Sequence, residues 1–234
     1  MKVGITDRVG SNAVHPSRVT PGLNRAYISS LNGYKSNTID PKTFKLTNCT
    51  AACGPVIYRG SNFPEKFNGW SFICESGVQM IKAVKVDYSD GRIKGSHPLG
   101  ENEFLTSTDE RFRPVNLHNA PDGSLYLVDL YHGIIQHKTY MTSYLREQTL
   151  SRKLEGPGLG HGRIYRIRAK NKPLAKVPNL EKAATNSLIA QLASPTGALR
   201  DLAQQQLIGR KADPAPVRSA LTKAVSKKME LATI

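Results

Sequence analysis

The sequence has few of the features that mark a membrane protein or a dedicated nucleic-acid binder. Among its 234 residues, no apolar stretch approaches the roughly 18 residues that a membrane helix needs. The first twenty residues are polar and contain no apolar core, so we expect no signal peptide in this stretch. The net charge is +15, but no block of five or six like charges is present, and the aromatic-plus-basic signature of common RNA and DNA modules is missing. We therefore expect no transmembrane segment and no nucleic-acid partner.

Cysteine is also scarce, with three residues at Cys49, Cys53 and Cys74. The spacing of the first two is typical neither of a zinc site nor of a thioredoxin motif, and we assign no residue of this chain as a metal ligand. No C-x-x-C-H motif occurs, which excludes covalent haem attachment within this chain. Two alternatives remain open for the thiols: one disulfide in an oxidising compartment, or three buried free cysteines.

The sequence does contain a series of short apolar segments separated by turns, which indicates a mainly β fold. Residues 1–45 are rich in Gly, Asn, Ser and Pro and are expected to be loops. Strands are predicted at 56–58, 70–74, 79–88, 124–130 and 162–168, and residues 131–136 are expected to extend the hairpin before them into a further strand. Residues 142–154 have helical character.

The most informative segment is Asp109–Tyr131, which begins with two arginines. Arg111 and Arg113 would share one face of a strand, because side chains alternate along it. Pro114 cannot donate to a ladder, which places the arginine segment at a strand start or edge. Two guanidinium groups on one face could receive carboxylates, phosphates or quinone oxygens. The alternative is that they pair with the two acidic residues just before them at a wet surface.

A tight turn follows at Pro121-Asp122-Gly123. Pro presets φ, Asp bonds locally and Gly tolerates a positive φ. The strand after this turn is apolar on both faces, with Leu125 and Leu127 on one and Tyr126 on the other. A strand of this kind is expected to be buried on both faces.

After Lys170 the pattern changes to that of helices. Residues 171–178 are predicted to be a linker and 179–234 a helical segment, with helices over 180–192, over 199–208 and from Asp213. Helices separated by short breaks are the repeating unit of a helical solenoid, and we interpret this segment as little more than one such unit. A single unit cannot bury its apolar face alone. The alternative is an ordinary helical appendage packed on the sheet domain.

Several of these segments resemble, in the same order, the late blades of glucose/sorbosone dehydrogenase-like β-propellers. They are Tyr58–Gly60 with Phe67–Ile73, the run Asp109–Val115, the strand Pro121–Asp129 and the closing Gly162–Ile167. The chain resembles the large membrane-bound dehydrogenase proteins of planctomycete- and verrucomicrobium-type bacteria, which join such a propeller to helical repeats and often to a C-terminal haem domain. Arg200–Gln204 resembles the start of their HEAT-like segment. The resemblance implies that residues 1–170 are the C-terminal part of a β-propeller and that 179–234 are HEAT-like.

The same resemblance implies a cofactor site. In the pyrroloquinoline-quinone sugar dehydrogenases of this superfamily, an Arg-Tyr-Arg on a late blade binds the cofactor, and Arg111-Phe112-Arg113 is similar in position and pattern. Arg111 and Arg113 are therefore the expected cofactor-binding residues for pyrroloquinoline quinone (PQQ), which calcium would accompany. Gly77 stands where these enzymes carry a cofactor-binding lysine. No residue here is assigned as catalytic, because the catalytic histidine of the family belongs to an early blade.

The activity implied is quinone-linked oxidation of a sugar or aldehyde in the periplasm, with electrons passing to a haem domain outside this chain. The alternative is a non-catalytic propeller and HEAT-like module that binds carbohydrate or protein partners. Propellers close about four to eight blades of about four strands into a ring, and about eight strands make only two blades here. We therefore expect a C-terminal fragment, a truncated gene product or one part of a split protein, which missing blades would complete and which is inactive alone.

Overall fold

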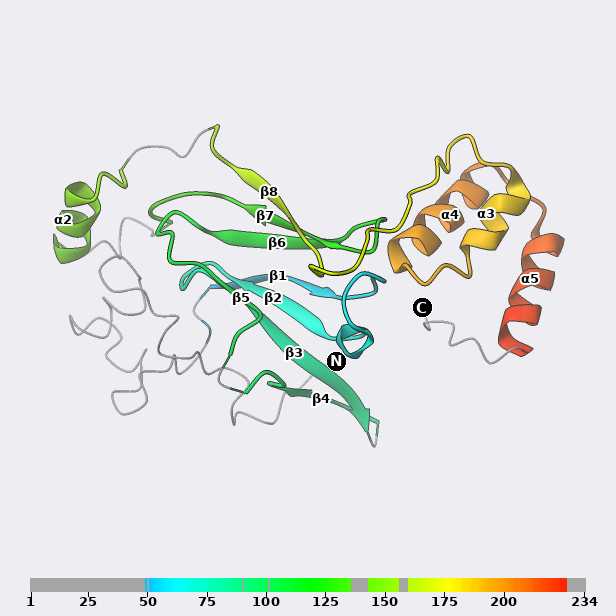
Figure 1. The fold of residues 1–234 in the computed structure, drawn as a ribbon, viewed down its shortest axis with the longest axis horizontal. Helices are drawn as coiled ribbons and strands as arrows, with labels where there is room; N and C mark the ends of the chain where they lie inside the picture. The colour runs from blue at the N-terminus through cyan, green and yellow to red at the C-terminus, as the bar shows by residue number, and fades with distance from the viewer. Residues whose placement is uncertain are drawn as a thin grey trace. The chain divides into compact units, whose positions relative to one another are not determined.

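The computed structural model describes residues 49, 51–89, 91–100, 102–135, 143–155 and 160–226. These residues belong to two compact units, which are described separately (Figure 1). The sheet unit holds the described residues up to Tyr58 and those within 69–118 and 126–166. The helical unit combines two loops, Arg59–Asn68 and Asn119–Leu125, with the chain from Ile167 onward.

The sheet unit contains two antiparallel sheets, which confirms the predicted mainly β fold. The first sheet has the order β1-β2-β3-β4, with β5 also paired to β3, and is formed by β1 (Ala52–Ile57), β2 (Ser71–Glu75), β3 (Met80–Ser89), β4 (Arg92–Ser96) and β5 (Leu105–Thr106). The second sheet has the order β6-β7-β8 and is formed by β6 (Pro114–Asn119), β7 (Leu125–Asp129) and β8 (Arg163–Ile167). Both sheets are open, and the residues that the structure describes form no closed barrel or propeller ring.

Part of the core of the sheet unit lies on the face of the first sheet that carries Phe72 and Cys74. The antiparallel register pairs Phe72 with Ala83 and Cys74 with Ile81, and all four side chains are fully buried. Phe104 packs edge-on against Phe72, with ring centroids 4.5 Å apart. Such edge-to-face contacts stabilise the core beyond the burial of apolar area alone.

The two sheets meet where β1 runs beside β6 (Figure 1). Gly54 in β1 has a φ of +52°, and a Cβ atom added there would lie 2.5 Å from the Val115 carbonyl oxygen of β6. The register of β1 with β2 also shifts between Cys53 and Val56, as at a β-bulge. Glycine is required at this point because it combines a positive φ with a close approach of two backbones.

The predicted turn between β6 and β7 is confirmed. Gly123 has a φ of +85°, and its N–H donates to the Ala120 carbonyl at 3.0 Å. Asp122 Oδ1 accepts the backbone N–H of Ser124 at 3.0 Å and its hydroxyl at 2.5 Å. These are the local bonds that the Pro-Asp-Gly sequence favours.

Burial of β7 follows an alternating pattern rather than the expected burial on both faces. Leu125 and Leu127 are fully buried, whereas Tyr126 and Val128 are half-buried. The prediction of full burial on both faces is therefore wrong, and the apolar side chains of the second face remain partly exposed. The final strand predicted at 162–168 is confirmed as β8.

The arginine segment is not a strand, so the prediction of a strand that carries both Arg111 and Arg113 is wrong. Arg111 lies in a turn, and β6 begins only at Pro114. The N–H of Phe112 donates to the Asp109 carbonyl, and the N–H of Arg111 donates to Asp109 Oδ1 at 2.9 Å. An aspartate side chain that bonds the backbone two residues on offers the chain a local alternative to a strand ladder.

Two other parts of the structure differ from the sequence analysis: a predicted strand is absent and an unpredicted one is present. Residues 131–135 are not a strand, because Tyr131 has a φ of +50° and its N–H donates to Asp129 Oδ1, which turns the chain. Strand β4 was not predicted, since Arg92–Ser96 is polar and lacks apolar alternation. It forms by pairing with the end of β3.

The helical unit contains α3 (Thr185–Gln191), α4 (Gly197–Gly209) and α5 (Pro214–Ser226), in the places of the three predicted helices. Its core is formed by leucines of α3, α4 and the preceding segment, namely Leu180, Leu188, Leu199 and Leu207. A further helix, α2 (Ser143–Ser151), belongs to the sheet unit, within the predicted range 142–154. No helix in the described part of the chain is both long and apolar enough to cross a membrane.

Polar contacts attach the loop Arg59–Asn68 to the rest of the helical unit. Arg59 donates to both carboxylate oxygens of Asp201 in α4, at 2.9 and 3.0 Å. The Asn62 side-chain amide donates to the Lys172 carbonyl at 3.3 Å. Residues 171–178 contain neither helix nor strand, and Asn62 holds their start in place.

Replacing Gly54 by alanine should destabilise the sheet unit, because the new Cβ atom has to displace the backbone of β6. We expect the free energy of unfolding to fall by about 2–4 kcal/mol in a denaturant titration. Gly69→Ala is the matched control, since Gly69 has a φ of +79° but no described atom within 4 Å of an added Cβ. Only the conformational cost of about 1–2 kcal/mol applies there. Equal losses in the two variants would show that β1 and β6 do not press together.

Candidate functional site

Arg113, the residue before β6, is buried inside the sheet unit with 3% of its surface exposed. Its guanidinium donates to three backbone carbonyls: Nη1 to Ser76 at 3.0 Å, Nε to His132 at 3.0 Å and Nη2 to Gly133 at 2.8 Å. Ser76 follows β2 of the first sheet, whereas His132 and Gly133 follow β7 of the second. Arg113 therefore joins the turns of the two sheets through one planar group. A guanidinium can make these three bonds because its donors point in fixed, different directions, whereas an ammonium group is a compact point charge.

Asp129, at the end of β7, holds the backbone of this region. Its Oδ1 accepts the N–H of Arg113 and the N–H of Tyr131, both at 2.8 Å. Burial lowers the pKa of the Arg113 guanidinium to about 10, because removal from water disfavours the charged form. The carboxylates of Glu110, Asp129 and Asp109 act in the opposite direction. Arg113 is therefore a buried cation that remains charged at neutral pH.

Arg111 lies close to the same region but has a different partner. Its Nη2 donates to the Lys153 carbonyl at 2.8 Å. The next residue, Leu154, packs against Gly133, where an added Cβ atom would lie 2.7 Å from the Leu154 Cβ. The two guanidinium groups thus bind segments that contact each other, rather than forming one joint receptor. Arg111 is only partly buried, which leaves its side chain more accessible to a ligand than that of Arg113.

The two acidic residues that precede Arg111 in the sequence contact other arginines. Glu110 forms a short ion pair with Arg152. Asp109 lies 3.9 Å from Nη1 of Arg163 in β8. The ion pairs that these two acidic side chains form are therefore with Arg152 and Arg163, and not with Arg111 or Arg113 as the alternative interpretation of the sequence had them.

The sequence analysis missed a buried ion pair on the first sheet. Lys82 Nζ lies 3.2 Å from Glu103 Oε1, with side chains 2% and 1% exposed, and His97 Nε2 lies 3.9 Å from the same oxygen. The sequence does contain one indication of this pair, which is the position of Lys82 within the apolar run of β3. A lysine buried there needs a partner of opposite charge. The partner itself could not be read from the sequence, since Glu103 lies outside any strand and 21 residues away.

None of the described residues form a group of three or more His, Cys, Asp or Glu side chains that could hold a metal ion. The buried Lys82–Glu103 pair is closed to solvent, so it contributes to the fold rather than to a ligand site. Arg111 is the charged group of the predicted site that a ligand from solvent can reach.

Removing the charge of Lys82 should be costly. We expect Lys82→Met to lower the free energy of unfolding by about 3–5 kcal/mol, since it leaves the Glu103 carboxylate buried without its cation. The double variant Lys82→Met/Glu103→Leu should recover most of this loss, because no uncompensated charge remains. Urea titration of the wild type, both single variants and the double variant measures the coupling. Losses that simply add in the double variant would contradict a direct ion pair.

Comparison with known proteins places the chain in a family whose function is not known. No curated protein matches the chain significantly, and no solved structure does. A family model described as Domain of unknown function (DUF7133) matches residues 4–171, well over half of the chain. The chain therefore belongs to the DUF7133 family.

Proposed function

We propose that this chain supplies two blades of a glucose/sorbosone dehydrogenase-like β-propeller, which oxidises a sugar or aldehyde in a quinone-linked reaction when complete. The observation that carries the proposal is the succession of two antiparallel sheets whose strands follow one another in chain order, β1 to β4 and β6 to β8. Blades of a propeller are sheets of this kind with about four strands. The first strands of the two sheets, β1 and β6, approach closely at Gly54, as the inner strands of neighbouring blades would.

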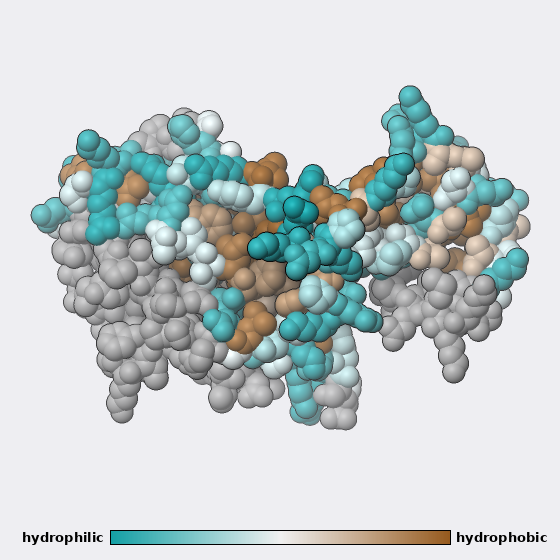
Figure 2. All heavy atoms as spheres, in the orientation of Figure 1, coloured by the Kyte–Doolittle hydropathy of each residue, from teal (hydrophilic) through white to brown (hydrophobic). Residues whose placement is uncertain are grey.

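The exposed strands of both sheets support the presence of further blades in the working protein. Ile164 in β8 is 74% exposed and Tyr88 in β3 is 77% exposed. Figure 2 shows hydrophobic residues at the surface among hydrophilic ones. Exposed strands with apolar side chains are usually covered or paired in native proteins. Blades outside the described residues would provide that cover.

Arg111 and Arg113 would serve an anionic quinone such as PQQ in different ways. Arg111, which is partly exposed, fits the role of an anion contact, because a guanidinium binds carboxylates in a fork geometry. Arg113 fits a positioning role, since its guanidinium already holds the carbonyls of the surrounding turns. Calcium would accompany the quinone, with ligands from outside the described residues. A haem domain outside this chain would receive the electrons in an extracytoplasmic compartment.

Titration of the full-length protein with PQQ and calcium tests the cofactor site. We expect a shift in quinone absorbance, and Arg111→Met should weaken quinone binding about tenfold or more, as the loss of one charge-assisted hydrogen bond does. Arg152→Met is the matched control, because Arg152 is a neighbouring surface arginine that pairs with Glu110. This control should bind like the wild type. Absence of a shift in the wild type, or equal affinities of the wild type and Arg111→Met, would contradict the proposal.

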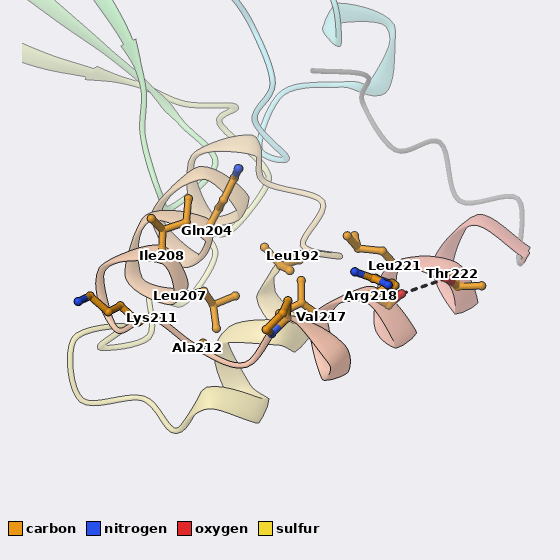
Figure 3. Close-up of a pocket in the computed structure, with 11 residues that line it drawn as sticks. Leu192, Gln204, Leu207, Ile208, Lys211, Ala212, Val217, Arg218, Leu221 and Thr222 are labelled. Atoms are coloured by element: carbon orange, nitrogen blue, oxygen red, sulfur yellow. Dashed lines mark hydrogen bonds between the residues drawn. The ribbon is translucent and has the colours of Figure 1, made fainter.

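The second candidate function is a non-catalytic module that binds protein or carbohydrate partners, and a groove in the helical unit favours it. The groove, of about 810 Å³, is lined by apolar side chains such as Leu207, Val217 and Leu221 (Figure 3). Lys211 and Arg218 also line it. This combination fits an amphipathic helix with acidic flanks. A full-length protein that binds such a peptide and gives no quinone shift would favour this candidate over the first.

A further inference from the structure

The register of the first sheet separates the three cysteines into a pair and a single residue. Cys53 in β1 and Cys74 in β2 are direct partners across the antiparallel ladder. Side chains of directly opposed residues project from the same face of a sheet, with Cα atoms about 4.5–5.5 Å apart. A disulfide requires Cα atoms about 4.4–6.8 Å apart, so this cross-strand pair is within bonding geometry without a change of register.

Cys49 is directed to the other face of the same sheet. Glu75 follows Cys74 in β2 and therefore projects from the opposite face. Its carboxylate accepts the N–H of Ala51 at 2.9 and 3.0 Å, which draws the segment before β1 to that side. The carboxylate of Glu75 also adds to the effect of burial in raising the pKa of Cys49 to about 11. Cys49 thus lies beside Glu75, with β2 between it and the Cys74 thiol.

We propose that Cys53 and Cys74 form a cross-strand disulfide when the protein folds under oxidising conditions, and that Cys49 remains the odd thiol. The two thiols each lose a proton, a sulfur–sulfur bond forms, and two electrons reduce a disulfide oxidant such as glutathione disulfide to two thiols. In the folded protein the Cys74 side chain is fully buried and the Cys53 side chain is half-buried. Burial slows exchange with external oxidants, so the bond is expected to form during folding. This inference does not depend on the proposed dehydrogenase function.

Oxidative refolding of the full chain in a glutathione redox buffer tests the pairing. After refolding, the mass should be lower by two hydrogen atoms, and alkylation under denaturing conditions should label one cysteine instead of three. Reduction should restore all three labels. Three labels after refolding would overturn the proposal.

Variants identify the partners, because Cys49 and Cys53 lie on the same tryptic peptide, residues 46–59. Cys49→Ser should still lose two hydrogen atoms on refolding and give a linked peptide that joins residues 46–59 to Cys74. Cys53→Ser and Cys74→Ser should keep two free thiols each. A disulfide in Cys53→Ser, or its absence in Cys49→Ser, would assign the bond to Cys49 and overturn the proposal. Fragmentation of the linked wild-type peptide gives the same assignment without any substitution.

Discussion

A single buried guanidinium, that of Arg113, connects the two sheets of this chain. Its three hydrogen bonds reach the carbonyl after β2 and the two carbonyls that follow the turn out of β7. These carbonyls belong to turns, which have no strand ladder of their own to pair with. A buried carbonyl without a donor is costly, so the arrangement of both turns depends on Arg113 staying in place.

This constraint also separates the roles of the two arginines that the sequence presents as a matched pair. The turn bonded by Asp109 directs Arg111 to the Lys153 carbonyl, close to solvent, while Arg113 continues inward toward β6. A ligand with negative charge can therefore meet Arg111, whereas Arg113 sets the positions of the backbone around it. In the proposed propeller, Arg111 would contact the quinone, and Arg113 would lie behind the loops that surround the quinone.

The sequence predicts those parts of the structure that local chemistry determines. The Pro-Asp-Gly turn forms through bonds within a few residues, and the helices of the tail follow from apolar spacing alone. The arginine strand was predicted wrongly because alternation is a weak signal where an aspartate can bond the backbone two residues on. The partners of Arg113 and Lys82 could not be predicted, since they lie 16 residues or more away in the chain and no periodic pattern connects them. The sequence does not determine which cysteines are close to each other for the same reason, because only the strand register brings Cys53 opposite Cys74.

The central claim is that Arg113 holds the two sheets together, and comparison of two arginine variants by denaturant unfolding tests it most directly. Arg113→Met should lower the free energy of unfolding by about 3 kcal/mol or more, because it leaves buried carbonyls without donors. Arg111→Met should lower it by less than about 1 kcal/mol, since one partly exposed bond is lost. Amide hydrogen exchange should report increased opening of residues 131–135 in Arg113→Met and little change there in Arg111→Met. Small and equal effects of the two substitutions would contradict the claim.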